Sequence, residues 1–366
     1  MRVRRIATLL LLAALALVPV IAAALGDSFY PDLVTRIMIF AIAAISLDLI
    51  LGYGGMVSFG HAAYLGLGAY AVGILSHHGI DDGFLHFAVA IAGSAALALF
   101  IGSVSLRTSG VHFIMITLAF TQMVFFLGES INLYGGDDGM SIPHHSNFGP
   151  LLDLDTPDAL YYFTFALLLL LLWTGHHLVN SRFGMAIRGI KSNEPRMRAL
   201  GFSTFRYRLA AFVISGAVCG AAGALFANQT LFVSPAIMQW SRSGEIMMMV
   251  ILGGMGTLVG PLLGAAIFLL LENLLAGATQ HWQAIMGLIL LLVVLFTRRG
   301  VFGLLPEERN LLPKERNLLP EERSLLPKER SLLPKERSPL PKERSLLPEE
   351  RSLPAEERSP LPENRA

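Results

Sequence analysis

Long apolar stretches, separated by short polar segments, run from the N-terminus to about residue 303. Most of them have about the 17–25 residues that a helix needs to cross the hydrocarbon core of a bilayer. The pattern therefore predicts an all-α, polytopic membrane protein with about ten transmembrane helices. The predicted spans lie near residues 6–25, 33–51, 60–79, 84–105, 111–131, 159–179, 208–227, 244–256, 258–276 and 282–297.

The first apolar run follows a basic N-terminus, Met1-Arg-Val-Arg-Arg5, and ends near Ala22-Ala-Ala24, which resembles a signal-peptidase site. At about 20 residues it is longer than the apolar region of a usual signal peptide, and further spans follow it. We therefore expect a retained first helix.

Composition supports the membrane assignment, because the chain is 54% hydrophobic and only 15% charged, with a mean hydropathy of +0.58. In soluble domains about a quarter of the residues are charged. Moreover, 13 of the 28 basic and 13 of the 27 acidic residues lie after residue 303. Residues 1–303 therefore carry only 15 basic and 14 acidic side chains. A soluble enzyme or a nucleic-acid-binding protein is excluded for residues 1–303, because this part has no basic face to follow phosphates.

The remaining charges predict the orientation. With ten spans and both termini in the cytoplasm, 13 of the 15 basic residues of this part lie on the cytoplasmic side, where Lys and Arg are enriched. This count requires a turn in the glycine-rich stretch Gly253–Pro261, between the eighth and ninth spans. A re-entrant break within the membrane is the alternative, allowed where protein or water pairs the backbone.

The C-terminal part, 304–366, repeats the heptad Leu-Leu-Pro-(Glu/Lys)-Glu-Arg-(Ser/Asn) nine times. Its 11 prolines prevent a continuous helix and therefore a coiled coil. We expect a disordered cytoplasmic tail, dispensable for transport, next to a permease domain of residues 1–303. A docking array for a partner is the alternative.

Glycines interrupt the apolar pattern between Ser46 and Tyr70. Glycine-broken helices at membrane depth expose carbonyl groups to the substrate in many transporters. Close packing of helices through small residues explains the same composition equally well. The spacing alone leaves both interpretations open.

This segment reads Gly-Tyr-Gly-Gly-x-x-Ser-x-Gly-His-Ala-Ala-x-x-Gly-x-Gly-Ala-Tyr from Gly52 to Tyr70. It resembles the signature of the branched-chain amino-acid type of ABC-transporter permease, the M-type subunit (LivM-like). Further similar stretches follow in the family's order, over residues 30–303. They are Thr117-Leu-Ala-Phe, the Gly135–Met140 loop, the basic Ser181–Phe202 segment and the glycine-rich Met249–Ala265 segment. Pro195-Arg196-Met197 departs from the small residues usual after the glutamate, and the tail has no counterpart in the family.

The resemblance implies an ATP-driven importer of branched-chain or related amino acids in the bacterial inner membrane. The chain contains no Gly-x-x-x-x-Gly-Lys-(Ser/Thr) motif, so ATP is expected to be hydrolysed by other subunits. The implied partners are a second permease subunit, two ATP-binding subunits, a periplasmic substrate-binding protein and membrane lipid. No cofactor and no nucleic acid are implied, and this subunit is expected not to be an enzyme.

The candidate functional residues form three groups. Those expected to line the translocation path are Asp48, Gly52, Gly54, Gly55, Ser58, Gly60, His61, Thr117 and Glu129. Those expected to couple to the ATPase are Arg188, Glu194, Arg198 and Gly201, with Glu194 to Gly201 forming a short helix that stops at glycine. The glycines expected to serve gating or packing are Gly253, Gly254, Gly256 and Gly260.

Charged residues within spans usually face other helices rather than lipid. Glu245 and Glu272 are of this kind, with Arg36 and Arg242 as expected partners. No metal site is predicted, because adjacent histidines in the three His-His pairs point in different directions on a helix. Cys219, in a Gly/Ala-rich run, is expected to be a packing residue.

Three alternatives to an amino-acid importer remain. A permease for urea or short amides would carry nearly the same motifs. A proton-coupled secondary transporter would also use membrane carboxylates and glycine-broken helices. A non-transporting membrane anchor is the third.

Overall fold

The computed structural model describes residues 2–25, 29–149, 154, 156–278, 281–296 and 300–301. The predicted tail, 304–366, lies outside the described residues. The longer helices are α1 (Arg2–Leu25), α2 (Phe29–Asp48), α3 (His61–His77), α4 (Gly83–Ser105), α5 (Val111–Ser130), α6 (Pro157–Asn180), α9 (Thr204–Thr230), α10 (Trp240–Gly253), α11 (Gly260–Ala278) and α12 (Trp282–Phe296). The shorter elements are η1 (Leu49–Tyr53), η2 (Asn132–Tyr134), β1 (Met140–Ser141), α7 (Arg182–Ser192), α8 (Glu194–Ala199), β2 (Phe232–Val233) and η4 (Pro235–Met238).

Each predicted span coincides with one of the longer helices, and the all-α fold is confirmed. Among the described residues, six helices are long and apolar enough to cross a membrane: 29–53, 83–105, 111–130, 158–180, 204–230 and 260–278. The other four predicted spans correspond to α1, α3, α10 and α12, whose helices or apolar stretches are shorter. The number of ten spans therefore stays a prediction.

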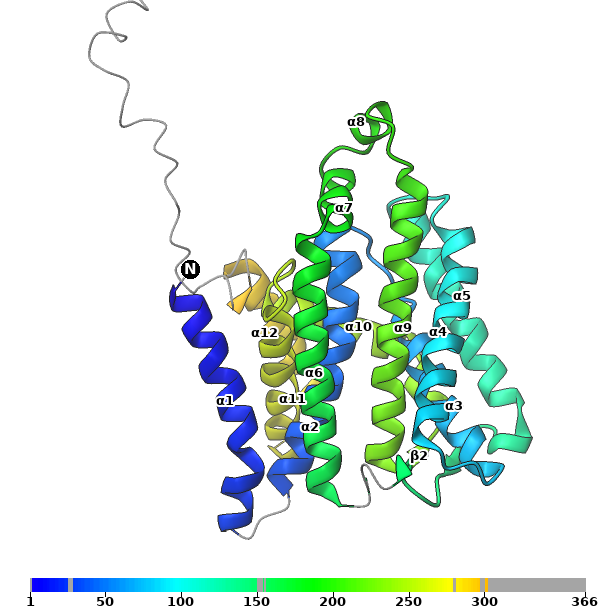
Figure 1. Ribbon diagram of the computed structural model, residues 1–366, viewed down its shortest axis with the longest axis vertical. Coiled ribbons are helices and arrows are strands. Elements are labelled where there is room, and N and C mark those ends of the chain that lie inside the picture. The colour runs from blue at the N-terminus through cyan, green and yellow to red at the C-terminus, as the bar shows by residue number, and fades with distance from the viewer. Residues whose placement is uncertain are drawn as a thin grey trace, which may run out of the picture. The chain divides into compact units, whose positions relative to one another are not determined.

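Helix α9 lies at the centre of the bundle, between α3, α4 and α2 (Figure 1). Small residues allow this close approach. A Cβ on Gly223 would lie 1.9 Å from the carbonyl oxygen of Leu65, and one on Gly68 would lie 2.1 Å from that of Gly220. Cys219, on the same helix, is fully buried, which confirms its role in packing.

Helices α10 and α11 fold back on each other and both pack against α2. A Cβ on Gly253 would lie 1.9 Å from the oxygen of Gly260, and one on Gly264 would lie 1.8 Å from the oxygen of Met249. These pairs run in opposite chain directions, so the stretch between Gly253 and Gly260 is a turn joining two antiparallel helices, as the charge count required. Gly254 and Gly256 lie in this turn, both with positive φ.

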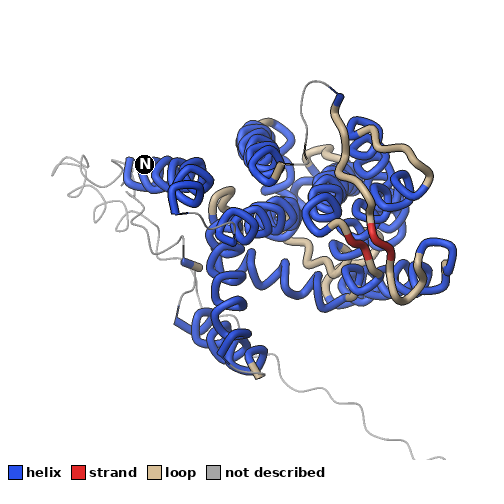
Figure 2. The backbone as a smooth tube through the Cα atoms, turned by 90° about the horizontal axis from the view of Figure 1, so that it is seen from below, coloured by secondary structure: helices blue, strands red, loops and turns tan. Residues whose placement is uncertain are grey.

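The two ends of the bundle are built differently. At one end α7 continues beyond α6, beside the end of α9, and α8 projects beyond both (Figure 1). At the other end β1 pairs antiparallel with β2, with Met140 opposite Val233 (Figure 2). This pairing ties the α5–α6 connection to the α9–α10 connection.

Candidate functional site

The predicted glycine-rich interruption is present between α2 and α3. Helix α2 ends at Asp48, one π-helical turn (η1) follows, and residues 54–60 are non-helical before α3 begins at His61. Gly55 has a φ of 70°, which favours glycine. We use the name re-entrant segment for residues 54–60, the non-helical stretch that lies within the bundle between the apolar helices α2 and α3.

Remote side chains pair the backbone of this segment. Phe59 N–H donates to Thr117 Oγ1 at 3.2 Å, and the Phe59 oxygen accepts from Thr121 Oγ1 at 2.8 Å and from Ser243 Oγ at 2.7 Å. Ser243 Oγ also accepts from the N–H of Ala62 at 2.9 Å. Non-helical backbone is tolerated inside a membrane only with such partners. Thr117, a predicted path residue, thus holds the segment in place.

His61 and Ser58, two other predicted path residues, are fully buried within this chain. The Ser215 hydroxyl donates to the Ser46 oxygen at 2.5 Å and lies 2.8 Å from His61 Nε2. Because that hydroxyl has only one hydrogen, His61 Nε2 is the donor of the second bond. Ser58 Oγ accepts from Gly60 N–H at 3.1 Å. Contact of either side chain with a path stays a prediction.

Asp48 and Gly52 meet the α10–α11 turn. Asp48 is only 1% exposed, and its Oδ1 accepts from the N–H of Gly256 at 2.8 Å. A Cβ on Gly52 would lie 2.1 Å from this oxygen and 2.3 Å from the nitrogen of Gly256. Only glycine at position 52 leaves room for this hydrogen bond. Asp48 and Gly52, predicted as path residues, therefore contact Gly256, one of the glycines predicted to serve gating or packing.

The predicted short helix with a glycine stop is α8. Asn193 caps its N-terminus, accepting from Arg196 N–H at 2.9 Å, and Pro195 lies in the first turn, where proline is tolerated. Gly201 has a φ of 85° and ends the helix. Its N–H donates to the oxygen of Arg198, as in a Schellman motif. The unusual Pro195 is therefore compatible with the helix start.

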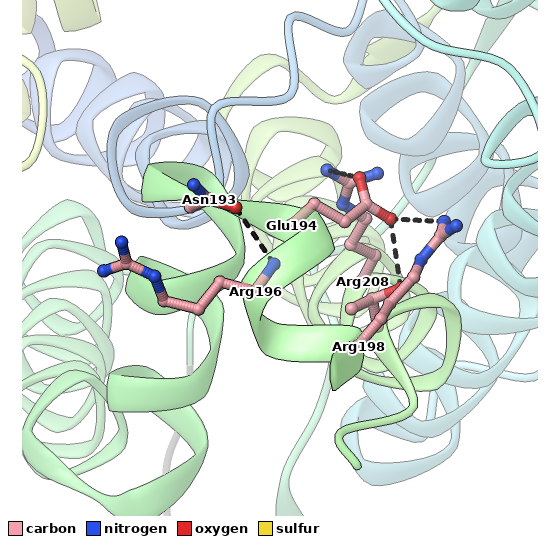
Figure 3. A network of polar contacts seen from close by, with 6 residues as sticks. Asn193, Glu194, Arg196, Arg198 and Arg208 are labelled. Atoms are coloured by element: carbon pink, nitrogen blue, oxygen red, sulfur yellow. Dashed lines mark hydrogen bonds and ion pairs between the residues drawn. The ribbon is translucent and has the colours of Figure 1, made fainter. Parts of the chain in front are cut away.

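Glu194 is the centre of a polar network that closes α8 onto α9 (Figure 3). Its carboxylate accepts from Arg198 at 2.6 Å and from Thr204 Oγ1 at 3.0 Å, and it pairs with Arg208 at 2.7 Å. Partial burial raises the pKa of Glu194, but the Thr204 hydrogen bond and the charges of Arg208 and Arg198 outweigh burial and lower the pKa below its usual value. Glu194 thus stays ionised and holds α8 against α9.

The other predicted coupling residue, Arg188, lies outside this network. Its guanidinium donates to the Val179 oxygen at 3.0 Å and to the Gly184 oxygen at 3.4 Å. It thereby fixes the angle between the end of α6 and α7. We call α7, α8 and the turn that follows α8, residues 182–202, the tip.

Arg36 and Arg242, the basic residues predicted within spans, each pair with one of the predicted carboxylates. Arg36 on α2 lies 3.8 Å from Glu272 on α11, and Arg242 lies 2.7 Å from Glu245 on α10. Glu129 is half-buried near the end of α5. Pairing of opposite charges reduces the cost of placing them in a membrane.

Four residues with central contacts were not predicted from the sequence as site residues: Thr121, Ser215, Ser243 and Lys191. The first three are hydroxyl residues in apolar helices. Thr121 follows Thr117 by one helical turn, and this shared face was a signal that could have been used. Lys191 Nζ donates to the Gly52 oxygen at 2.5 Å, a contact across 139 residues for which the sequence offers no signal.

Comparison with known proteins identifies the class to which this geometry belongs. The model of the family described as branched-chain amino acid transport system / permease component matches residues 30–295. The chain therefore belongs to this family of transport permeases, which are not enzymes, and is a multi-pass membrane protein. No solved structure matches the chain.

Individual relatives carry the same description. The chain is 29% identical over 303 residues to the high-affinity branched-chain amino acid transport system permease protein LivM of Escherichia coli K12, covering 76% of this chain and 70% of the relative. It is 25% identical to a probable LivM of Methanocaldococcus jannaschii, covering 76% and 94%. It is also 24% identical to LivH of E. coli K12, covering 72% and 91%.

Proposed function

We propose that this chain is the M-type permease subunit of an ATP-driven importer of branched-chain or related amino acids. It would work in the bacterial inner membrane with a second permease subunit, two ATP-binding subunits and a periplasmic substrate-binding protein. The observation that carries this proposal is the tip, which projects from the bundle and is bonded through Lys191 to the oxygen of Gly52, two residues before the re-entrant segment. A secondary transporter needs no such connection.

The exposed surface of the tip suits a docking role. Leu200 and Phe202 are 66% and 39% exposed, and the side chain of Arg198 is 67% exposed beside them. An apolar patch with basic neighbours fits a groove that is apolar at its centre and acidic at its rim. The ATP-binding subunits would offer this groove. With ten spans, the tip lies in the cytoplasm, where these subunits are expected.

Docking is tested with the double variant Glu194→Gln/Gly201→Ala in the complete transporter. Gly201 and Gly79 both have positive φ, 85° and 75°, and a Cβ on either would meet nothing within 4 Å. Gly79→Ala, in the α3–α4 loop, is therefore a matched control for backbone strain. We expect the double variant to insert normally but to lose co-purification with the ATP-binding subunits and uptake of radiolabelled leucine. Normal co-purification and uptake would refute docking at the tip.

The path is proposed to run along the segment from Gly52 to Gly68, completed by the second permease subunit. Single cysteines along this segment, in a Cys219→Ser background, are expected to react with a water-soluble thiol reagent in a pattern that changes with ATP. Complete lack of reaction in every nucleotide state, with normal uptake, would mean that these glycines serve packing only. Uptake of urea in place of leucine would favour the amide-type permease.

A further inference from the structure

Three elements distant in sequence meet around one carbonyl group, that of Gly52 in η1. Lys191, in the last turn of α7, donates to it at 2.5 Å. On the other side of Gly52, Asp48 accepts from Gly256 in the α10–α11 turn. The tip, the broken helix and the glycine turn are therefore joined at this residue.

The Gly52 carbonyl is at the point where the helical hydrogen bonds run out. The oxygens of Ile50 and Leu51 accept from the N–H groups of Met56 and Gly55, which closes the π-helical turn. The next carbonyl, that of Gly52, accepts from the Lys191 ammonium instead. Helix ends leave carbonyls that need other partners, and a charged donor makes a stronger bond than a neutral one.

The path of the Lys191 side chain also depends on the break. A Cβ on Gly55 would lie 2.9 Å from Lys191 Cγ and 3.4 Å from Cδ. The aliphatic part of the Lys191 side chain therefore packs directly against the backbone of Gly55. Nearby, Asp48 is buried and its Oδ2 has no hydrogen-bond partner. The lysine thus combines packing and a hydrogen bond at one place.

We propose that Lys191 is the positioning residue through which movement of the tip reaches the re-entrant segment; this inference rests on the proposed function. Lys191 lies in the last turn of α7, directly before α8, so a displacement of the tip carries Lys191 with it. The bond to Gly52 holds η1 and the start of the re-entrant segment in the present conformation. Without that bond, movement of the tip no longer reaches η1 and the re-entrant segment.

The test compares Lys191→Met with Lys191→Arg and with Arg107→Met in the complete transporter reconstituted in liposomes. Methionine keeps much of the stem but donates no hydrogen bond. Arg107 is a matched control, because it is an exposed basic residue in the loop between α4 and α5, outside the tip. Co-purification, ATP hydrolysis and leucine uptake are measured for each variant.

We expect Lys191→Met to assemble and to hydrolyse ATP normally, while uptake per ATP falls about tenfold, as expected for loss of a charged hydrogen bond. Lys191→Arg should restore most uptake, and Arg107→Met should leave it unchanged. Unchanged uptake per ATP in Lys191→Met would overturn the inference. Loss of assembly in Lys191→Met would also overturn it, because Lys191 would then be a docking residue. Failure of the proposed function is recognised separately, by normal co-purification of the Glu194→Gln/Gly201→Ala variant.

Discussion

The tip and the re-entrant segment both interrupt long helices, but they pair their polar groups differently. Around α8 in the tip, hydrogen bonds join residues three to ten positions apart, as between Asn193 and Arg196 or Glu194 and Thr204, and the bond of Lys191 to Gly52 is the exception. In the re-entrant segment, Phe59 bonds to residues 58, 62 and 184 positions away. One structure depends on its own sequence, and the other depends on helices that pack around it.

The surroundings of the two regions differ as well. The charges of the tip are partly exposed, where an ion pair contributes about 0–1 kcal/mol. The bonds of the re-entrant segment are buried, where an unpaired group costs about 1–3 kcal/mol. We therefore expect substitutions in the segment and its supports to destabilise the protein more than equivalent substitutions in the tip.

The largest difference is expected between two glycines, one on each side of the comparison. In Gly52→Ala, the new Cβ would overlap Asp48 Oδ1 and the nitrogen of Gly256, so backbone must move. We expect a loss of about 1–3 kcal/mol or more. Gly201→Ala meets no atom and should cost about 1–2 kcal/mol for its left-handed backbone alone. Thermal unfolding of the purified protein in detergent measures both, and equal losses would contradict the comparison.

An intermediate effect is expected when a remote support is removed. Ser243→Ala leaves the N–H of Ala62 without its acceptor and takes one donor from the Phe59 oxygen. The expected cost is about 1–3 kcal/mol, with faster hydrogen exchange at residues 59–62. Ser103→Ala is the control, since the exposed Ser103 bonds only within its own helix. Similar unfolding temperatures for both variants would show that the re-entrant segment keeps its structure without the hydrogen bonds of Ser243.

The smallest effect is expected at Glu194 and depends on pH. Because its pKa is lowered in the folded protein, its contribution to stability is present above the usual carboxyl pKa and is lost as pH falls through the lowered value. Glu194→Gln should therefore be less stable than the native chain by about 1 kcal/mol or less at neutral pH, and the difference should vanish in acid. Unfolding temperatures across this pH range test it. A difference that persists in acid would mean that packing, not charge, is responsible.

Much of the fold could be predicted because its signals are local. Apolar runs located each long helix, although hydropathy placed the start of α9 at 208 instead of Thr204, because its first turn is polar. The α8 helix followed from Glu194 and Gly201, which lie within one short stretch. Arg36 and Arg242 were expected to pair with carboxylates within the spans, because a membrane disfavours isolated charges, but only the structure shows that Arg36 pairs with Glu272.

The amino-acid sequence by itself determined the positions of the long helices, the glycine break after α2 and the short helix of the tip. Each of these depends on residues close together in the chain, through hydropathy, backbone freedom and local hydrogen bonds. Only the tertiary structure decided that His61 bonds to Ser215, that Ser243 supports Phe59 and that Lys191 reaches Gly52. These partners are 139 to 184 residues apart, and their distance is set by how α3, α7, α9 and α10 pack, which no local pattern specifies.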